Sequence, residues 1–174
     1  MSLKSVLLVM ALTSGLASLP RGHAAEPITS MNQLVRMSRC ELEQLYRAAA
    51  PATAPDGFVK GRAIWLDTKH PVLKSRATQI LWQGKYFLDD ATIRNRVFGI
   101  RAFRADVFNG ESWFDGGPSL IMDYQNSSKL FSDVRDEVRE LSPGLYIGIT
   151  YLRKCPTPEL AMFFALEDRK SKCR

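Results

Sequence analysis

The sequence contains few of the residues that build metal centres. Among its 174 residues there are 2 histidines and 3 cysteines, and clusters of these types form zinc, haem and iron–sulfur sites. A glycine-rich phosphate-binding loop is also missing. Neither His23 nor His70 offers an obvious base for a catalytic thiol. We therefore expect no metal ion and no cofactor.

Long runs of one charge are also missing. The chain carries 24 Lys and Arg against 18 Asp and Glu, a formal net charge of +6, but the two signs are interleaved throughout. A nucleic-acid-binding surface requires basic residues gathered on one face or along one helix. The pattern therefore predicts a mixed-charge solvated surface and no nucleic-acid partner.

Only one long hydrophobic run is present, and it lies at the N-terminus. Residues 1–24 are typical of a secretory signal peptide: Lys4, an apolar stretch from Val6 to Leu19, and Gly22-His23-Ala24 before a cleavage site. The run is shorter than the roughly 20 residues of a spanning helix. Its removal takes Lys4 and Arg21 and leaves 22 basic and 18 acidic residues, a net charge of +4. We expect an exported protein, periplasmic or secreted, with no transmembrane segment after cleavage.

The three cysteines, Cys40, Cys155 and Cys173, all lie in the predicted mature chain. An oxidising compartment favours one disulfide and leaves one thiol over. If the strands on either side of Cys155 form a hairpin, Cys173 lies far from Cys155. We therefore predict a Cys40–Cys173 bond, which ties the C-terminal tail to the first helix.

A helix is predicted over residues 38–49. Ser38 and Glu41 have the spacing of a capping box, and Met37 can pack on Leu42. Leu42, Leu45 and Tyr46 then form a narrow apolar stripe. Residues 25–57 are interpreted as this helix, a looser preceding turn and a loop that begins at Pro51.

From Phe58 onward the pattern indicates short strands. Their expected bounds are 58–66, 84–87, 93–98, 101–108, 112–114, 119–124, 133–140, 145–152 and 160–166. Lys60 and Arg62 indicate that one face of the first strand is wet. Residues 72–81 are compatible with either a short helix or a loop. Asn109-Gly110 predicts a tight hairpin, and a short helical turn is expected over residues 127–131.

About eight or nine short antiparallel strands after one helix favour a closed or nearly closed β-barrel over residues 58–168. Closure removes the sheet edges that so many strands would otherwise expose. The interior of an eight-stranded barrel is filled by side chains or holds one small ligand. Residues 169–174 form a charged tail.

Several motifs resemble small lipocalin-like bacterial proteins of uncharacterised function. The resemblance is carried by residues 55–61, 82–87, 112–118, 123–124, 135–140 and 143–148. The Gly-x-Trp signature of true lipocalins is missing near the first strand, where Phe58 and Trp65 stand instead. The resemblance implies a calycin-type barrel, often with an apolar cavity, and implies no specific chemistry.

The stretch Arg135-Asp-Glu-Val-Arg-Glu140 supplies the most unusual polar candidates. On a strand, Asp136 shares a face with Val134 and Val138, so it points inward if the valines do. A buried carboxylate needs a partner. The competing interpretation is a ladder of surface ion pairs, each of small energy. The candidate ligand-binding residues are Trp113, Tyr124, Arg135, Asp136, Tyr146 and Tyr151.

Three functions remain open. The first is a binding protein for a small apolar or amphipathic ligand, without catalysis. The second is a hydrolase or isomerase that uses two of the carboxylates Asp115, Asp123 and Asp136 at the barrel mouth. The third is an envelope accessory protein with a solid barrel that acts through protein contacts. An apolar cavity with one polar end favours the first, convergent carboxylates favour the second, and a filled barrel with an exposed apolar patch favours the third. The oligomeric state is not predicted.

Overall fold

The computed structural model describes residues 27–66, 68–168 and 170. The predicted signal peptide, residues 1–24, lies outside the described residues and stays a prediction. Three helices are found in the described part: α1 (Met31–Leu34), α2 (Arg39–Ala48) and α3 (Pro71–Leu81). The strands are β1 (Ala50–Pro51), β2 (Gly57–Ile64), β3 (Trp82–Leu88), β4 (Thr92–Val97), β5 (Ile100–Glu111), β6 (Pro118–Asp123), β7 (Val134–Ser142), β8 (Leu145–Leu152) and β9 (Glu159–Glu167).

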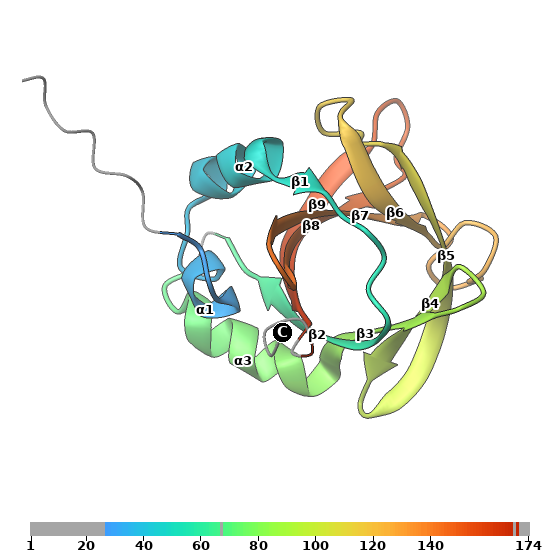
Figure 1. The fold of residues 1–174 in the computed structure, drawn as a ribbon, viewed down its shortest axis with the longest axis horizontal. Coiled ribbons are helices and arrows are strands. Elements are labelled where there is room, and N and C mark those ends of the chain that lie inside the picture. The colour runs from blue at the N-terminus through green and yellow to red at the C-terminus, as the bar shows by residue number, and fades with distance from the viewer. Residues whose placement is uncertain (1–26, 67, 169, 171–174) are drawn as a thin grey trace, which may run out of the picture.

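Strands β2 to β9 form a closed antiparallel barrel in which each strand pairs with the next along the chain (Figure 1). The β2–β9 pairing closes the barrel, as between Arg62 and Ala165. Short β1 adds to the edge of β7, beyond the end of β6. Over the described residues the fold is therefore mainly β, with eight barrel strands and one extra strand. The predicted fold class is confirmed.

The helices lie together on one side of the barrel, as Figure 1 shows. Helices α1 and α2 cover the outward-facing side chains of β8 and β9, including Ile147, Ile149 and Phe163. The side chains on the opposite face of the same strands, such as Phe164, fill the barrel interior. The barrel wall on this side is thus packed on both faces.

The predicted start of the main helix is confirmed. The Ser38 backbone amide donates to the Glu41 carboxylate at 2.7 Å, and the Ser38 hydroxyl accepts from the Glu41 amide at 3.4 Å. Leu42 and Tyr46 are fully buried against the barrel. A capped amphipathic helix needs no distant information to form, and this explains why the local prediction succeeds.

The predicted hairpin at Asn109-Gly110 is wrong. Strand β5 runs straight through both residues, which pair with Leu120 and Ser119 of β6. The predicted return strand at 112–114 is instead part of the turn between β5 and β6, where the Ser112 amide donates to the Gly117 carbonyl at 2.9 Å. The Glu137 carboxylate, distant in sequence, accepts from the Trp113 amide in this turn.

Two further predictions need correction. Residues 127–131 form turns and bends without a helix. Arg62 does not lie on a wet face: it is 5% exposed, because α1 and α3 cover this part of β2. The ambiguous segment 72–81 is helical and belongs to α3.

The structure tests the predictions about the cysteines only in part. Cys40 and Cys155 are exposed free thiols in the described part of the chain. Cys173 lies outside the described residues, so the Cys40–Cys173 bond stays a prediction. No helix among the described residues is long and apolar enough to cross a membrane.

Candidate functional site

The barrel interior contains a cavity of about 380 Å³. Its walls are mostly apolar, and aromatic side chains contribute much of the surface. The apolar lining residues are Ala63, Trp65, Leu81, Trp82, Val97, Phe103, Phe131, Val134, Met162 and Phe164. Leu81 is 47% exposed, so the cavity reaches the molecular surface beside the end of α3. This is the size and composition of a small-molecule site.

One side of the cavity is polar and centres on Lys85, which is 2% exposed. Its Nζ donates to the Asp136 carboxylate at 2.7 Å, to the Tyr124 hydroxyl at 2.7 Å and to Asn95 Oδ1 at 3.1 Å. The Thr150 hydroxyl donates to the other Asp136 oxygen at 2.6 Å. All three protons of the ammonium group are therefore used, and the charges of Lys85 and Asp136 balance.

Asn95 links this network to the barrel wall. Its side-chain amide donates to the Tyr124 hydroxyl at 2.8 Å and to the Phe103 carbonyl at 3.1 Å, and its oxygen accepts from Trp82 Nε1 at 2.9 Å. Phe103 is the extra residue of a bulge between β4 and β5, with φ of 52°. A bulge changes the direction of side chains and leaves backbone groups outside the hydrogen-bond ladder between the strands. Here the bulge directs the Phe103 ring into the cavity and its carbonyl to Asn95.

The ammonium group of Lys85 stays charged. Burial alone would lower the pKa of Lys85, but the Asp136 carboxylate and the Tyr124 hydroxyl outweigh that effect and raise it above its ordinary value. A charged ammonium group has no lone pair for nucleophilic attack. The arrangement therefore provides a paired, hydrogen-bonding polar end of the cavity and does not suit an amine nucleophile.

The six predicted ligand-binding residues lie in three different parts of the structure. Tyr124 and Asp136 line the cavity together. Tyr146 also packs in the barrel interior but is not part of the cavity wall. Trp113, Arg135 and Tyr151 lie together on the outside of the barrel, with Arg135 stacked on Trp113 at 4.2 Å and Trp113 against Tyr151 at 5.7 Å.

That outer group belongs to a second polar network around Glu137, which is fully buried. The Glu137 carboxylate accepts from the Trp113 amide at 2.9 Å and lies 3.2 Å from Arg135 Nε. Nearby, Arg139 donates to the Asp115 carboxylate and, at 3.0 Å, to the Tyr46 carbonyl of α2. These contacts attach α2 and the β5–β6 turn to the barrel, so the role of this network is structural.

The three carboxylates considered for acid–base chemistry do not converge. Asp115 pairs with Arg139, Asp123 with Arg153 at 2.6 Å, and Asp136 with Lys85. Asp136 alone of the three lines the cavity. Among the described residues, no group of three or more His, Cys, Asp or Glu side chains is placed to hold a metal ion.

Lys85, Asn95 and Thr150 are site residues that the sequence did not predict. Lys85 carries the one useful signal, because it shares a strand face with the buried Phe87 and lies two residues before it. Asn95 lies between Arg94 and Arg96 in a strand with several polar residues, and Thr150 is a single polar residue in the apolar strand β8, so neither stands out in the sequence. Their role depends on strands that meet only when the barrel closes.

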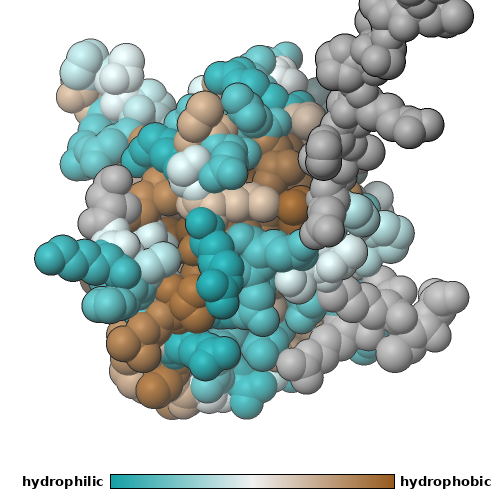
Figure 2. Space-filling view, turned by 90° about the vertical axis from the view of Figure 1, so that its left-hand side faces the viewer, coloured by the Kyte–Doolittle hydropathy of each residue, from teal (hydrophilic) through white to brown (hydrophobic). Residues whose placement is uncertain are grey.

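Several exposed hydrophobic residues adjoin residues of the cavity wall. Ile80 and Leu81 end α3, and Phe98 donates its backbone amide to the Leu81 carbonyl at 3.0 Å. Ile100 pairs with Val97 of the cavity wall, and Leu130 precedes Phe131. Figure 2 shows hydrophobic side chains reaching the surface in its lower left part, on the side that carries the helices. Apolar surface therefore lies next to the apolar cavity wall.

Stability is expected to fall at alkaline pH. Burial raises the pKa of Tyr46, Tyr124 and Tyr146 to about 12 each, against about 10 in an unfolded chain. Between these values the folded state holds more protons than the unfolded state, so the free energy of unfolding decreases as pH rises above about 10. Each tyrosine contributes on the order of 2–3 kcal/mol to this loss. The raised pKa of Lys85 acts in the same direction.

Urea unfolding at pH 7, 9 and 11 measures this effect. Tyr146→Phe is the sharpest variant, because its hydroxyl makes no side-chain hydrogen bond within the described residues. We expect the free energy of unfolding of this variant to change little at pH 7. Between pH 9 and 11 it should fall by less than that of the unchanged protein. Equal losses in the two proteins would contradict the argument.

Comparison with solved structures finds a protein with a similar fold. The crystal structure of a protein from Thermomonospora curvata superposes with a TM-score of 0.52 at 17% sequence identity, covering 76% of this chain and 88% of that one. No protein-family model matches the sequence, and no curated protein is significantly similar to it. At this identity the likeness supports the barrel fold and does not assign it to the lipocalins or calycins.

Proposed function

We propose that this protein binds a small, largely apolar molecule with one polar end inside the barrel, as lipocalin-like proteins do. The observation that carries the proposal is the cavity of about 380 Å³, apolar along most of its wall and polar at Lys85 and Asp136. Ligand sites are commonly cavities of this kind, with a few polar groups that fix orientation. In this proposal the protein acts after export, as the N-terminal sequence predicts.

The charges of the polar end favour an uncharged head group. Lys85 is already matched by Asp136 at 2.7 Å, so a ligand carboxylate would bring an unpaired charge into a buried site, which is costly. Asp136 accepts three hydrogen bonds, from Lys85, Tyr124 and Thr150, and a carboxylate has room for about four. A ligand hydroxyl can supply the fourth. A medium-chain alcohol therefore fits better than the matching fatty acid.

Intrinsic fluorescence provides the test. Trp65 and Trp82 line the cavity, whereas Trp113 lies outside it. In a Trp113→Phe background, titration with decan-1-ol should change the emission with a saturating curve, and decanoate should bind at least 10-fold more weakly. The proposal is overturned if decan-1-ol, decanoate and the neutral dye N-phenyl-1-naphthylamine all fail to show saturable binding.

Cavity-filling variants localise the site. Val97→Phe adds volume at the cavity wall and should weaken decan-1-ol binding at least 10-fold, and Met162→Trp serves as a second such variant. Val72→Phe is the matched control, since Val72 lies on α3 outside the cavity. Folding of each variant is checked by thermal unfolding. Equal affinity in all three would place the ligand elsewhere.

The alternatives receive less support. A carboxylate-dependent hydrolase or isomerase requires two positioned carboxylates, and Asp136 is the one carboxylate in the described wall of the cavity. An accessory protein that acts through protein contacts would have a solid barrel, so the cavity does not favour that alternative.

A further inference from the structure

A separate polar pocket lies outside the barrel, between α1, α3 and β2. Its volume is about 300 Å³. Lys60 and Arg62 reach it from β2, Arg76 and Gln79 from α3, and Asn32 from α1. The proposed ligand cavity shares none of these residues, so the two sites are distinct.

Arg62 has an unmet hydrogen-bonding group in this pocket. The residue is 5% exposed, and its guanidinium donates to Ser75 Oγ at 3.2 Å and to the Asn32 side chain. Its Nη2 atom is buried and has no hydrogen-bond partner. A buried donor without a partner costs free energy, and such exceptions are rare in folded proteins. An acceptor from outside the chain would satisfy it.

The charges around Arg62 also lack compensation. Within the described residues Arg62 makes no ion pair with a carboxylate, and Glu167 is the one acidic residue that lines the pocket. Lys60, Arg62 and Arg76 carry three positive charges against that single negative charge. Burial lowers the pKa of Arg62, and the neighbouring Arg76 adds to this effect. The pocket therefore has an excess charge of +2.

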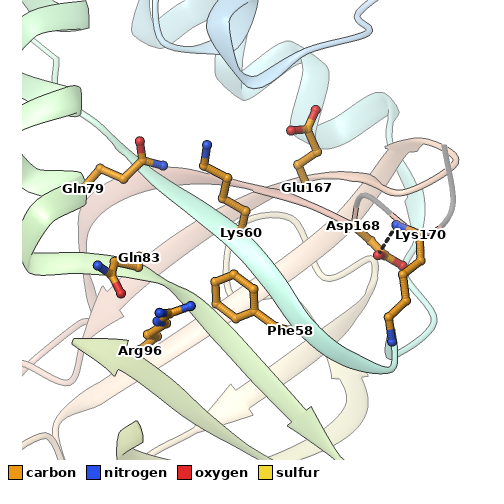
Figure 3. Close-up of a pocket in the computed structure, with 8 residues that line it drawn as sticks. All are labelled: Phe58, Lys60, Gln79, Gln83, Arg96, Glu167, Asp168 and Lys170. Atoms are coloured by element: carbon orange, nitrogen blue, oxygen red, sulfur yellow. Dashed lines mark hydrogen bonds between the residues drawn. The ribbon is translucent and has the colours of Figure 1, made fainter. Parts of the chain in front are cut away.

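A second depression adjoins the pocket and shares Lys60, Gln79 and Glu167 with it. Figure 3 shows the Lys60 and Glu167 side chains pointing in the same direction, with the Gln79 side chain extending from α3 toward Lys60. Buried Arg96 Nε and Gln83 Oε1 in this depression also lack hydrogen-bond partners. Further donors and acceptors are thus available beyond the first pocket for the remainder of a larger molecule.

We infer that the pocket at Arg62 binds a doubly charged oxyanion of the phosphate type, held by the guanidinium groups of Arg62 and Arg76 and the ammonium group of Lys60. The guanidinium fork matches the oxygens of phosphate. A dianion cancels the excess charge of +2 and gives Arg62 its missing acceptor. The anion is free phosphate or the phosphate group of a small ester.

Isothermal titration calorimetry of the full mature chain at low ionic strength tests the inference, with inorganic phosphate and glycerol 3-phosphate as probes. We expect saturable binding of at least one probe. Tighter binding of glycerol 3-phosphate indicates an ester as the natural ligand, and tighter binding of inorganic phosphate indicates the free anion. Saturable binding of neither probe overturns the inference.

Variants assign the binding to this pocket. Arg76→Ala, at an exposed position, should weaken the affinity at least 5-fold, and Arg62→Met should abolish binding and remove the rise in Tm that saturating phosphate gives the unchanged protein. Arg94→Ala is the matched control: this exposed arginine of β4 lines neither depression and should change affinity less than 2-fold. If Arg76→Ala binds phosphate as the unchanged protein does, the inference fails, even if Arg62→Met does not fold. Decan-1-ol binding in Arg76→Ala reports separately on the barrel cavity.

Discussion

Replacing Asp136 with leucine is expected to lower the free energy of unfolding by about 3–5 kcal/mol. The change leaves the Lys85 ammonium, 2% exposed, without its counter-charge. It also removes the acceptor of the Thr150 and Tyr124 hydroxyls. Breaking one half of a buried ion pair costs more than the pair contributes, because the remaining charge stays desolvated. Urea unfolding at pH 7 measures the loss.

The double variant Lys85→Met/Asp136→Leu tests the cause. Removing both charges eliminates the unpaired ion, so the double variant should recover at least half of the stability lost in Asp136→Leu. Asp133→Asn is the matched control, since Asp133 is exposed three residues earlier in the chain, and it should change stability by less than about 0.5 kcal/mol. If Asp136→Leu does not accumulate as folded protein, Asp136→Asn is compared with the double variant instead. A double variant no more stable than the single one would refute the charge-pair explanation.

Replacing Glu137 with leucine is expected to cost a similar amount, about 3–5 kcal/mol. Glu137 is fully buried, and its loss leaves Arg135, 9% exposed, without its carboxylate. It also removes the acceptor for the Trp113 amide and the Ser112 hydroxyl. The Tyr46 hydroxyl of α2 also donates to Glu137, at 3.4 Å. The effect should therefore be local as well as global, because Glu137 holds both α2 and the β5–β6 turn.

Hydrogen exchange distinguishes this explanation from general destabilisation. In Glu137→Leu, amides of α2 and of the turn over residues 112–117 should lose protection before those of β8 and β9. Glu111→Gln changes an exposed glutamate at the end of β5 and should leave both stability and exchange unchanged. Uniform loss of protection across the barrel in Glu137→Leu would show that Glu137 does not act through this turn.

The two buried polar networks differ in how far the sequence predicts them. The alternation predicted that Asp136 shares a strand face with Val134 and Val138, and in the structure that face lies inside the barrel. The competing interpretation, a ladder of surface ion pairs, would expose the other strand face, with Arg135, Glu137 and Arg139, to solvent. All three are buried, because α2 and the β5–β6 turn cover them.

The failed hairpin at Asn109-Gly110 has a related cause. The turn signal is real locally, yet both residues pair with β6. Contacts from Glu137 and Arg139 fix the turn after Ser112 instead. A few tertiary hydrogen bonds to buried charged groups outweigh a local preference of about 1 kcal/mol.

The sequence by itself determined the fold class, through the number and close spacing of its short strands. It also determined the strand alternation and the capped helix over 38–49, since both depend on neighbours within a few residues. The tertiary structure decided the binding sites. Lys85 and Asp136 are 51 residues apart on β3 and β7, strands that do not pair with each other in the sheet. They meet only because closure turns the inner faces of both strands toward one centre. Arg62 likewise becomes buried only when α1 and α3 fold over β2, and no local pattern reports such long-range burial.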